Sequence, residues 1–535
     1  MTAPELMTDA VARLRRWADE RPEAILLLTR GHRYTYAEVL ARATRVAAAL
    51  RAAGGGRGRR VALLLEEYDQ FFITMLGAWL AGAVVVPLNT TLPRHDLEWL
   101  FGKSLPDVLV LPAADACLAR GPRRLEVTAD ADGLVDGLRP ADEPAPADEP
   151  APADDSAPAD QPTPGDTPAA VAPPAPESLP EDQAIAEDDL AMIMFTSGTT
   201  GLPKGVCQDL RAVSSNAGHV ALTLGLAPDD RIFINTPPYF TSGICHFLTL
   251  LAAGGGTAGQ LGFFFGAGLL DEMQALGCTG FGGAPAHLVR VVEPLEAPRE
   301  HALRFWVSSG DHLPPAVIAK LRRVLPGVRL FNMYGLTEVS GRLCVLPPAD
   351  LDARPGSVGR PIGDMRVVAR RGDGTPAAPG ETGELFVTGS LLMREYLAEP
   401  EITRRTLTAH GLRTGDFGHL DADGYVWIAG RKDDIIKRGG EKVSIVHVQQ
   451  ALQGLERFAD VAVVAAPDDI LGHVPVAFIV PLPGEVVKPS RLLRELRGVL
   501  PPSSLPTRAV VVDEIPRTGS GKAIRARLLE LLEPG

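Results

Sequence analysis

The chain has 535 residues, more than one hydrophobic core usually supports, so we expect at least two domains and enough length to bury a ligand. Its 53 basic and 66 acidic residues give a net charge of -13, which opposes binding to nucleic acid or to an anionic membrane surface. The amino-terminal stretch carries scattered charges and lacks the apolar run of a secretory signal, so we expect a cytoplasmic protein.

The five cysteines show neither the paired spacing nor the neighbouring histidines of a zinc site. We therefore expect no zinc and interpret the cysteines as buried thiols in a reducing compartment. They are Cys117, Cys207, Cys245, Cys278 and Cys344.

Apolar runs alternate with helical spacing along much of the chain. Residues 61–65 and 84–86 are short apolar runs, and residues 70–81 between them have helical apolar spacing, which predicts a βαβ unit. Strand-like runs recur at 231–234 and 305–308. Helical patterns recur at 286–292 and 317–325. The alternation predicts an α/β fold with largely parallel sheets.

Residues from about 130 to 187 are dominated by Pro, Ala, Asp and Glu, and the unit ADEPAP occurs at 141–146 and again at 147–152. Such a composition cannot pack a core and predicts a flexible, partly polyproline-like insertion. A docking segment for a partner is the alternative interpretation.

Residues 232–270 contain no Asp, Glu, Lys or Arg, and a membrane-spanning helix needs about 20 apolar residues. Glycines and prolines interrupt this stretch, so we expect no membrane span but a buried helix near 246–253 followed by core strands. Alternatively, the stretch forms the wall of an apolar pocket. After about Arg431 the chain regains apolar runs and ends in a helical pattern at 523–532, which predicts a small α+β domain.

The motif at 196–206, Thr-Ser-Gly-Thr-Thr-Gly-Leu-Pro-Lys-Gly-Val, directly follows the apolar run 190–195. Glycines let the backbone approach phosphate oxygens, hydroxyl and amide groups donate to them, and a lysine balances their charge. The order Pro203-Lys204-Gly205 excludes a Walker A loop. A glycine-rich surface turn is the alternative.

This motif resembles the phosphate loop of the adenylate-forming superfamily, which comprises acyl-CoA synthetases, luciferases and peptide-synthetase adenylation domains. The resemblance implies an amino-terminal adenylation domain over residues 1–430 and a mobile carboxy-terminal domain over 431–535. It implies catalytic roles for Thr196 and Lys204. It also implies nucleotide contacts from Ser197, Gly198, Thr199, Thr200 and Gly201.

Three further motifs follow in the order of that superfamily. Residues 334–338, Tyr-Gly-Leu-Thr-Glu, resemble Y-G-x-T-E, in which the threonine contacts phosphate and the glutamate helps to hold Mg²⁺. Residues 414–416 resemble T-G-D, whose aspartate binds the ribose hydroxyls, and residues 430–434 resemble the segment that joins the two domains. Alone, each motif is equally typical of a turn. The implied nucleotide contacts are Tyr334, Gly335, Thr337, Asp416 and Arg431, with Glu338 as catalytic metal ligand and Asp433 as hinge.

The carboxy-terminal part holds two more matches. Residues 516–522 resemble P-x-T-x-x-G-K, which implies that Lys522 stabilises charge between the carboxylate and the α-phosphate during adenylation. Alone, Lys522 would be a solvated loop lysine. Gly439 and Gly440 begin a segment that resembles the loop serving thioester formation, although His447 and Gln449 replace acidic residues common in relatives.

The expected acyl site lacks the aspartate with which amino-acid-activating members pair the substrate ammonium, because Thr241 stands there. We therefore expect no α-amino acid as substrate. Small residues and few charges predict a wide, mostly apolar site for a bulky hydrophobic or aromatic acid, unless the glycines only serve chain turns. Asp311 and His312 either contact adenine or face solvent, and the sequence leaves both alternatives open. The predicted pocket residues are Phe240, Thr241, Ser242, Gly243, Gly283, Ala284, Ser309 and Gly310.

The resemblance implies that ATP and Mg²⁺ activate a carboxylic acid to an acyl adenylate with release of pyrophosphate, and that CoA then forms a thioester. Two alternatives remain open at this point: transfer to a carrier-protein thiol, and a catalytically silent adenylate-binding scaffold. The oligomeric state is open as well. Five intact residues argue against a silent protein: Lys204, Glu338, Asp416, Arg431 and Lys522.

Overall fold

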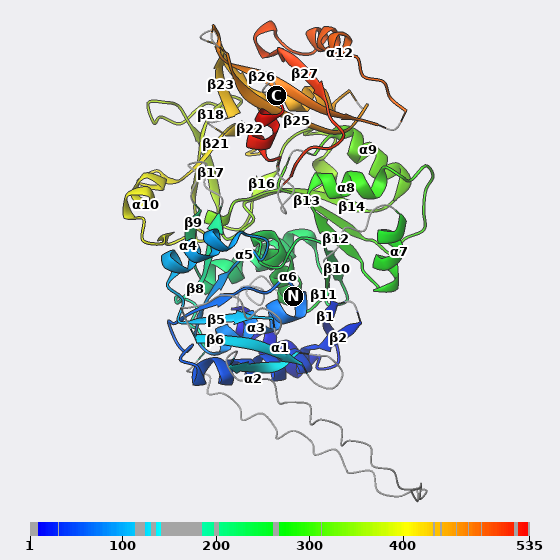
Figure 1. The fold of residues 1–535 in the computed structure, drawn as a ribbon. Helices are drawn as coiled ribbons and strands as arrows, with labels where there is room; N and C mark the ends of the chain where they lie inside the picture. The colour runs from blue at the N-terminus through cyan, green and yellow to red at the C-terminus, as the bar shows by residue number, and fades with distance from the viewer. Residues whose placement is uncertain are drawn as a thin grey trace, which may run out of the picture.

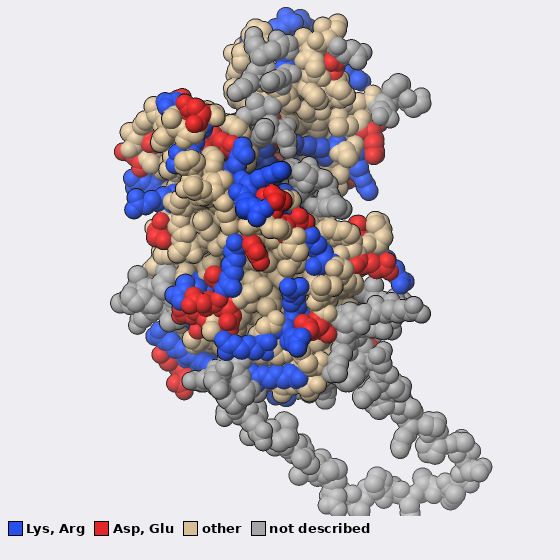
Figure 2. Space-filling model, turned by 90° about the vertical axis from the view of Figure 1, so that its left-hand side faces the viewer, with Lys and Arg blue, Asp and Glu red and all other residues tan. Residues whose placement is uncertain are grey.

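Two large β-sheets form the body of the amino-terminal part in the computed structural model of the chain (Figure 1). The structure describes residues 9–532 except for 30, 113–122, 130–134, 141–183, 197–202, 260–266, 312, 432–433, 439–440, 456, 469, 483 and 518–522. Figure 2, which looks at the left-hand side of Figure 1, shows that basic and acidic side chains are interspersed over this face.

The first sheet has nine strands in the order β16-β15-β14-β13-β12-β10-β11-β1-β2. Its inner strands, from β14 to β1, are parallel neighbours, and antiparallel strands complete both edges. The strands are β1 (Ile25–Thr29), β2 (His32–Thr35), β10 (Arg231–Ile234), β11 (Gly256–Gly259), β12 (Gly280–Gly283), β13 (Phe305–Ser309), β14 (Arg329–Tyr334), β15 (Cys344–Leu346) and β16 (Arg360–Pro361).

The second sheet has eight strands in the order β19-β9-β8-β4-β3-β5-β6-β7. Strands β8, β4, β3, β5 and β6 are parallel neighbours. The strands are β3 (Arg60–Leu63), β4 (Val84–Pro87), β5 (Val108–Leu111), β6 (Arg123–Ala129), β7 (Val135–Pro140), β8 (Leu190–Thr196), β9 (Lys204–Asp209) and β19 (Glu395–Tyr396).

Helices pack between the two sheets and on their outer faces. Val61 and Leu63 of β3 belong to the central core with helices α2, α3, α5 and α6, whereas Ala62 and Leu64 face the α4 side, as expected from strand alternation. Helix α3 is buried around almost its whole circumference, which explains its continuous apolar sequence. The helices are α1 (Ala10–Glu20), α2 (Tyr36–Ala52), α3 (Tyr68–Leu80), α4 (Arg94–Ser104), α5 (Leu210–Leu224), α6 (Thr241–Ala253), α7 (Ala267–Ala275), α8 (Pro285–Val292) and α9 (Pro315–Val324).

A third sheet, of five strands, leads from this body to the carboxy-terminal part. It contains β17 (Arg366–Arg370), β18 (Gly383–Thr388), β20 (Leu407–Thr408), β21 (Gly411–Leu420) and β22 (Val426–Arg431), with helix α10 (Pro400–Thr406) beside it. Strand β22 ends at Arg431, the residue at which we predict that the carboxy-terminal domain begins.

The carboxy-terminal part forms a small α+β unit at the top of Figure 1, as predicted. Its sheet has hydrophobic clusters on both faces, because residues such as Val463 and Val464 alternate between them. The unit contains β23 (Ile435–Arg438), β24 (Glu441–Ser444), β25 (Phe458–Asp468), β26 (Gly472–Pro481), β27 (Arg508–Val511), α11 (Ile445–Gln453), α12 (Pro489–Glu495) and α13 (Arg525–Glu530).

The structure corrects the start of the predicted insertion. Residues 135–140, which fall within the range expected to be flexible, form β7 and pair antiparallel with β6. Val135 is 3% exposed and packs into the central core. The composition of the stretch did not predict this strand, because Asp, Gly and Pro residues surround Val135. Residues 141–183 of the predicted insertion lie outside the described part of the chain.

The uncharged stretch 232–270 is divided among short elements. It contributes β10, the 13-residue helix α6 and β11 to the first sheet and its covering helix layer. Among the residues that the structure describes, no helix combines the length and the apolar character needed to cross a membrane.

Candidate functional site

The phosphate-loop motif is framed by a β-hairpin. Strands β8 and β9 pair antiparallel and place Thr196 directly opposite Lys204. Because β8 runs parallel to β4, Thr196 lies at the carboxyl end of a parallel strand, where α/β folds bind ligands. Ser197, Gly198, Thr199, Thr200 and Gly201 lie outside the described residues, between the two strands.

Tyr396 joins two residues that were predicted separately. Its hydroxyl donates to Glu338 Oε1 at 2.7 Å, and Lys204 Nζ lies 5.5 Å from the centre of its ring. Strand β19 holds Tyr396 next to Val206 on β9. Sequence reasoning missed this tyrosine, because 58 residues separate it from Glu338 and no phosphate-type motif surrounds it.

Replacing Tyr396 with phenylalanine removes the hydrogen bond to Glu338 and keeps the ring beside Lys204. A hydrogen bond to a charged group contributes about 1.5–3 kcal/mol, so we expect acid-dependent pyrophosphate release to fall about 10- to 100-fold. The measurement is a titration of the rate against Mg²⁺ concentration, and we expect half-saturation to shift upward. An unchanged Mg²⁺ dependence would show that Tyr396 does not position Glu338.

Thr337 links the motif at 334–338 to helix α6. Its hydroxyl lies 3.1 Å from the hydroxyl of Thr241, the first residue of α6, and its carbonyl accepts a hydrogen bond from the Gln208 amide. Gln208 is 2% exposed, so this contact is held inside the protein. A predicted phosphate ligand and a predicted acyl-site residue are therefore direct neighbours.

Gly335 occupies a position with no room for a side chain. A Cβ atom there would lie 1.8 Å from the carbonyl oxygen of Gly341 and 2.9 Å from the Cα atom of Arg342. We expect Gly335→Ala to displace this backbone and to lower both the rate of pyrophosphate release and the midpoint of thermal unfolding. Gly372→Ala is the comparison variant, because a Cβ atom at this exposed turn glycine meets open space and its φ is not positive. An active, fully stable Gly335→Ala enzyme would contradict the expectation.

Asp416 is the centre of a second cluster. It is 4% exposed, it accepts a hydrogen bond from the Tyr334 hydroxyl, and it accepts another from Arg431 Nε at 3.1 Å. Strands β21 and β22 place Asp416 and Arg431 opposite each other. Burial and the neighbouring Asp416 raise the pKa of Tyr334 well above its usual value, so Tyr334 remains a donor at neutral pH.

Arg431 connects this cluster to the metal-binding motif. Burial acts to lower the pKa of Arg431, but the charge of Asp416 and the nearby Tyr334 and Glu338 raise it, so the guanidinium stays charged. The positive charge of Arg431 therefore interacts with the carboxylates of both Asp416 and Glu338. The predicted ribose ligand and the predicted metal ligand thus belong to one site.

The carboxy-terminal part is tied to this site near the predicted hinge. The backbone N–H of Arg431 donates to Asp434 at 3.0 Å, and Arg525 of α13 forms an ion pair with the same carboxylate. Asp434 is 6% exposed. The hinge residue Asp433 and the loop glycines Gly439 and Gly440 lie outside the described residues.

The segment that leads to Lys522 faces the amino-terminal body. Arg517 forms a two-pronged ion pair with Asp460. Burial acts to lower the pKa of Arg517, but the hydrogen bond and charge of Asp460, together with the charge of Asp311, raise it. Burial, together with Arg290 and Arg517, lowers the pKa of His287 on α8 to about 4. Lys522 itself and His312 lie outside the described residues.

The predicted pocket residues gather at the carboxyl ends of parallel strands and at helix starts. Gly283 ends β12 and Ala284 precedes α8. Ser309 ends β13, and Phe240 immediately precedes α6. Gly310 follows β13 and has open space beside its Cα atom, whereas Gly243 and Gly283 pack closely against their neighbours. Thr241 and Ser242 form the first turn of α6.

One carboxylate with a nearby polyphosphate suits Mg²⁺, which prefers one or two carboxylates, substrate phosphate oxygens and water. Glu338 is the carboxylate predicted for this role, and its Oε1 accepts the hydrogen bond from the Tyr396 hydroxyl. No group of three or more acidic, histidine or cysteine side chains that could enclose a metal occurs in the described part of the chain. The residues therefore fit a metal ion that arrives with the nucleotide.

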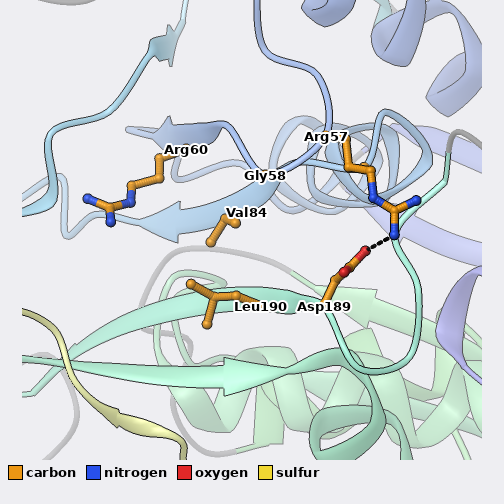
Figure 3. A pocket seen from close by; sticks show the side chains of 7 residues that line it. Arg57, Gly58, Arg60, Val84, Asp189 and Leu190 are labelled. Carbon is orange, nitrogen blue, oxygen red and sulfur yellow. Dashed lines mark hydrogen bonds and ion pairs between the residues drawn. The ribbon is translucent and has the colours of Figure 1, made fainter.

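A separate pocket lies at the opposite end of the second sheet (Figure 3). It is lined by Arg60, Val84 and Leu190, the first residues of β3, β4 and β8, and an ion pair of 2.8 Å between Arg57 and Asp189 borders it. Its volume is about 220 Å³, below the range of about 300–1,000 Å³ typical of ligand pockets. The carboxyl ends of the strands remain the candidate site.

Comparison with known proteins agrees with this geometry. The family model of AMP-binding enzymes matches residues 14–397, and the model of the AMP-binding enzyme carboxy-terminal domain matches residues 447–522. The chain is 30% identical to the long-chain-fatty-acid–CoA ligase FadD13 of Mycobacterium tuberculosis, covering 93% of each chain. It is 30% identical to a feruloyl-CoA synthase of Amycolatopsis sp, covering 95% of this chain and 96% of the relative.

A solved structure with the same fold is the O-succinylbenzoate CoA synthetase MenE of Bacillus subtilis in complex with ATP and magnesium ion. It is 25% identical, with a TM-score of 0.79, and the match covers 96% of this chain and 98% of the other. The predicted use of ATP, Mg²⁺ and CoA agrees with this family. The chain belongs to the family of AMP-binding enzymes and is an AMP-forming acid–thiol ligase of the acyl-CoA synthetase type.

Proposed function

We propose that this ligase joins a bulky hydrophobic or aromatic carboxylic acid to CoA and that it does not use α-amino acids. The observation that carries the proposal is the first turn of α6, where Thr241 meets Thr337 and no residue of the turn supplies a carboxylate for an ammonium group. The next residues of the same helix, Ile244 and Cys245, have apolar side chains. A buried ammonium group without a charge partner would be strongly disfavoured.

In the first half-reaction, a carboxylate oxygen of the acid attacks the α-phosphorus of ATP, and the bond from that phosphorus to the pyrophosphate oxygen breaks. Asp416 and Arg431 hold the ribose side of the nucleotide, while Thr337 donates to phosphate. Glu338 would hold Mg²⁺, which would supply positive charge to offset that of the polyphosphate. Lys522 stabilises the charge that develops between the carboxylate and the α-phosphate.

In the second half-reaction, the CoA thiol loses its proton to solvent, and its sulfur attacks the carbonyl carbon of the acyl adenylate. The bond between that carbon and the phosphate oxygen of AMP breaks, and AMP leaves. The carboxy-terminal domain reorients about Asp433 between the two steps. A carrier-protein thiol is the alternative acceptor, and it would attack the same carbonyl carbon.

The test supplies the purified enzyme with ATP, Mg²⁺ and a panel of fatty, aryl, polycyclic and amino acids, with and without CoA. We expect pyrophosphate release with aryl or bulky apolar acids and an acyl-CoA product detected by mass spectrometry. Release driven best by an α-amino acid would overturn the substrate assignment. Release without any acyl-CoA would favour a carrier-protein acceptor, and no release with any acid would favour the silent scaffold.

A further inference from the structure

Arg342 and His246 form a buried polar pair between helix α6 and the segment that follows the motif at 334–338. Arg342 lies just after the motif at 334–338 and is 6% exposed, while His246 lies on α6 and is 5% exposed. Arg342 Nη2 and His246 Nε2 are 3.4 Å apart. Neither residue was singled out as a site residue from the sequence.

The guanidinium of Arg342 has more donors than partners. An arginine carries five N–H donors, and His246 Nε2 is the hydrogen-bond partner that the described residues give to this side chain. No carboxylate in the described part of the chain forms an ion pair with it. By contrast, Arg431 pairs with Asp416 and Arg517 pairs with Asp460. A buried charge without a counter-charge is unfavourable, so an anion from outside the chain would stabilise Arg342.

His246 orients this guanidinium and does not add a second charge. Burial and the neighbouring Arg342 lower the pKa of His246 well below its usual value, so the imidazole is neutral and its Nε2 accepts a hydrogen bond. Gly282 on β12 makes room for the ring, because a Cβ atom there would lie 2.6 Å from the imidazole. The glycine, the histidine and the arginine thus form one arrangement.

The pair lies behind the reacting end of the site along helix α6. Thr241, in the first turn, touches Thr337, and Cys245, one turn later, donates to the carbonyl of Ser340 at 3.4 Å. His246 and Arg342 come next along the same two segments, so their contact lies beyond those of Thr241 with Thr337 and Cys245 with Ser340. A substrate whose carboxylate reaches the α-phosphate near Thr337 would direct its far end toward Arg342.

We propose that Arg342 is a specificity-determining residue that binds a second acidic group of the substrate, a carboxylate or a sulfonate, at the end remote from the reacting carboxylate. This inference rests on the proposed function and narrows its substrate class to bulky or aromatic acids that carry two acidic groups. An arginine is suited to this role, because its planar donors match the geometry of a carboxylate.

The experiment compares three acids of similar shape: 4-methylbenzoate, terephthalate and 4-sulfobenzoate. We expect kcat/KM for pyrophosphate release by the wild type to be at least about 10-fold higher with the two dianions than with 4-methylbenzoate. In Arg342→Met we expect a fall of about 100-fold with the dianions and less than about 3-fold with 4-methylbenzoate. Arg342→Lys should restore part of the preference, because it returns a positive charge.

Arg329→Met is the matched control, because Arg329 begins the same strand, β14, that leads into the motif, and it lies at the end remote from the site. We expect it to keep the wild-type preference. An equal fall in kcat/KM with all three acids in Arg342→Met would overturn the inference. A wild type that does not prefer the dianions would also overturn it. Neither result would count against the proposed ligase function. If Arg342→Met does not fold, the ratio of kcat/KM for the dianions to kcat/KM for 4-methylbenzoate in the wild type tests the inference. No release with any acid would instead count against the proposed function.

Discussion

Glu338→Gln is expected to reduce acid-dependent pyrophosphate release about 100- to 1,000-fold, the effect of removing one charge-stabilising group from an active site. The substitution keeps the size of the side chain and an oxygen that can accept a hydrogen bond from Tyr396, but it removes the negative charge that we propose holds Mg²⁺. We therefore expect a higher Mg²⁺ requirement together with the loss of rate. The measurement is the initial rate at several Mg²⁺ concentrations.

Glu395→Gln is the matched control for this prediction. Glu395 is exposed and lies beside Tyr396 on β19. Its substitution removes one negative charge, as Glu338→Gln does, but outside the site. We expect wild-type rates and an unchanged Mg²⁺ requirement. If Glu338→Gln retained wild-type rates at low Mg²⁺, Glu338 could not be the metal ligand.

Asp416→Asn is expected to lower kcat/KM for ATP about 100-fold, because hydrogen bonds to a charged group contribute about 1.5–3 kcal/mol each and the ribose offers two hydroxyls. The substitution also removes the counter-charge of Arg431 and one acceptor of the Tyr334 hydroxyl. Steady-state kinetics with ATP as the varied substrate measure the effect.

Asp423→Asn provides the comparison, because Asp423 is 63% exposed and pairs with Arg354 near the surface. We expect its kcat/KM for ATP to remain within about 2-fold of wild type, as for most surface substitutions. An unaltered kcat/KM in Asp416→Asn would contradict the assignment of Asp416 to the ribose. A fall in thermal stability alone, with normal kinetics, would assign it a structural role.

Local patterns in the sequence predicted many elements of the fold. The βαβ unit of residues 61–86 is confirmed as β3, α3 and β4, with β3 and β4 parallel, and the run 231–234 is confirmed as β10. Helix α6 begins at Thr241, five residues before the predicted helix near 246–253. Its first turn contains Thr, Ser and Gly, which give no apolar period, and contacts with the rest of the protein hold it.

In the site, too, local motifs predicted individual residues but not the contacts between distant segments. Tyr334, Thr337, Glu338, Asp416 and Arg431 were predicted from motifs, and the structure brings these residues together. The partners that orient them were not predicted, because their contacts depend on strand pairing between distant segments. Tyr396 reaches Glu338 through the pairing of β19 with β9. Arg342 reaches His246 through the packing of α6 against β12, which Gly282 permits.

The most direct test of the central claim is acid-dependent pyrophosphate release from ATP, measured for the wild type, for Lys522→Ala and for the exposed-lysine control Lys488→Ala. We predict release only when an acid is present, its loss in Lys522→Ala, and wild-type rates in Lys488→Ala. Release that does not depend on any acid, or that persists unchanged in Lys522→Ala, would contradict activation of a carboxylic acid as an acyl adenylate by this chain.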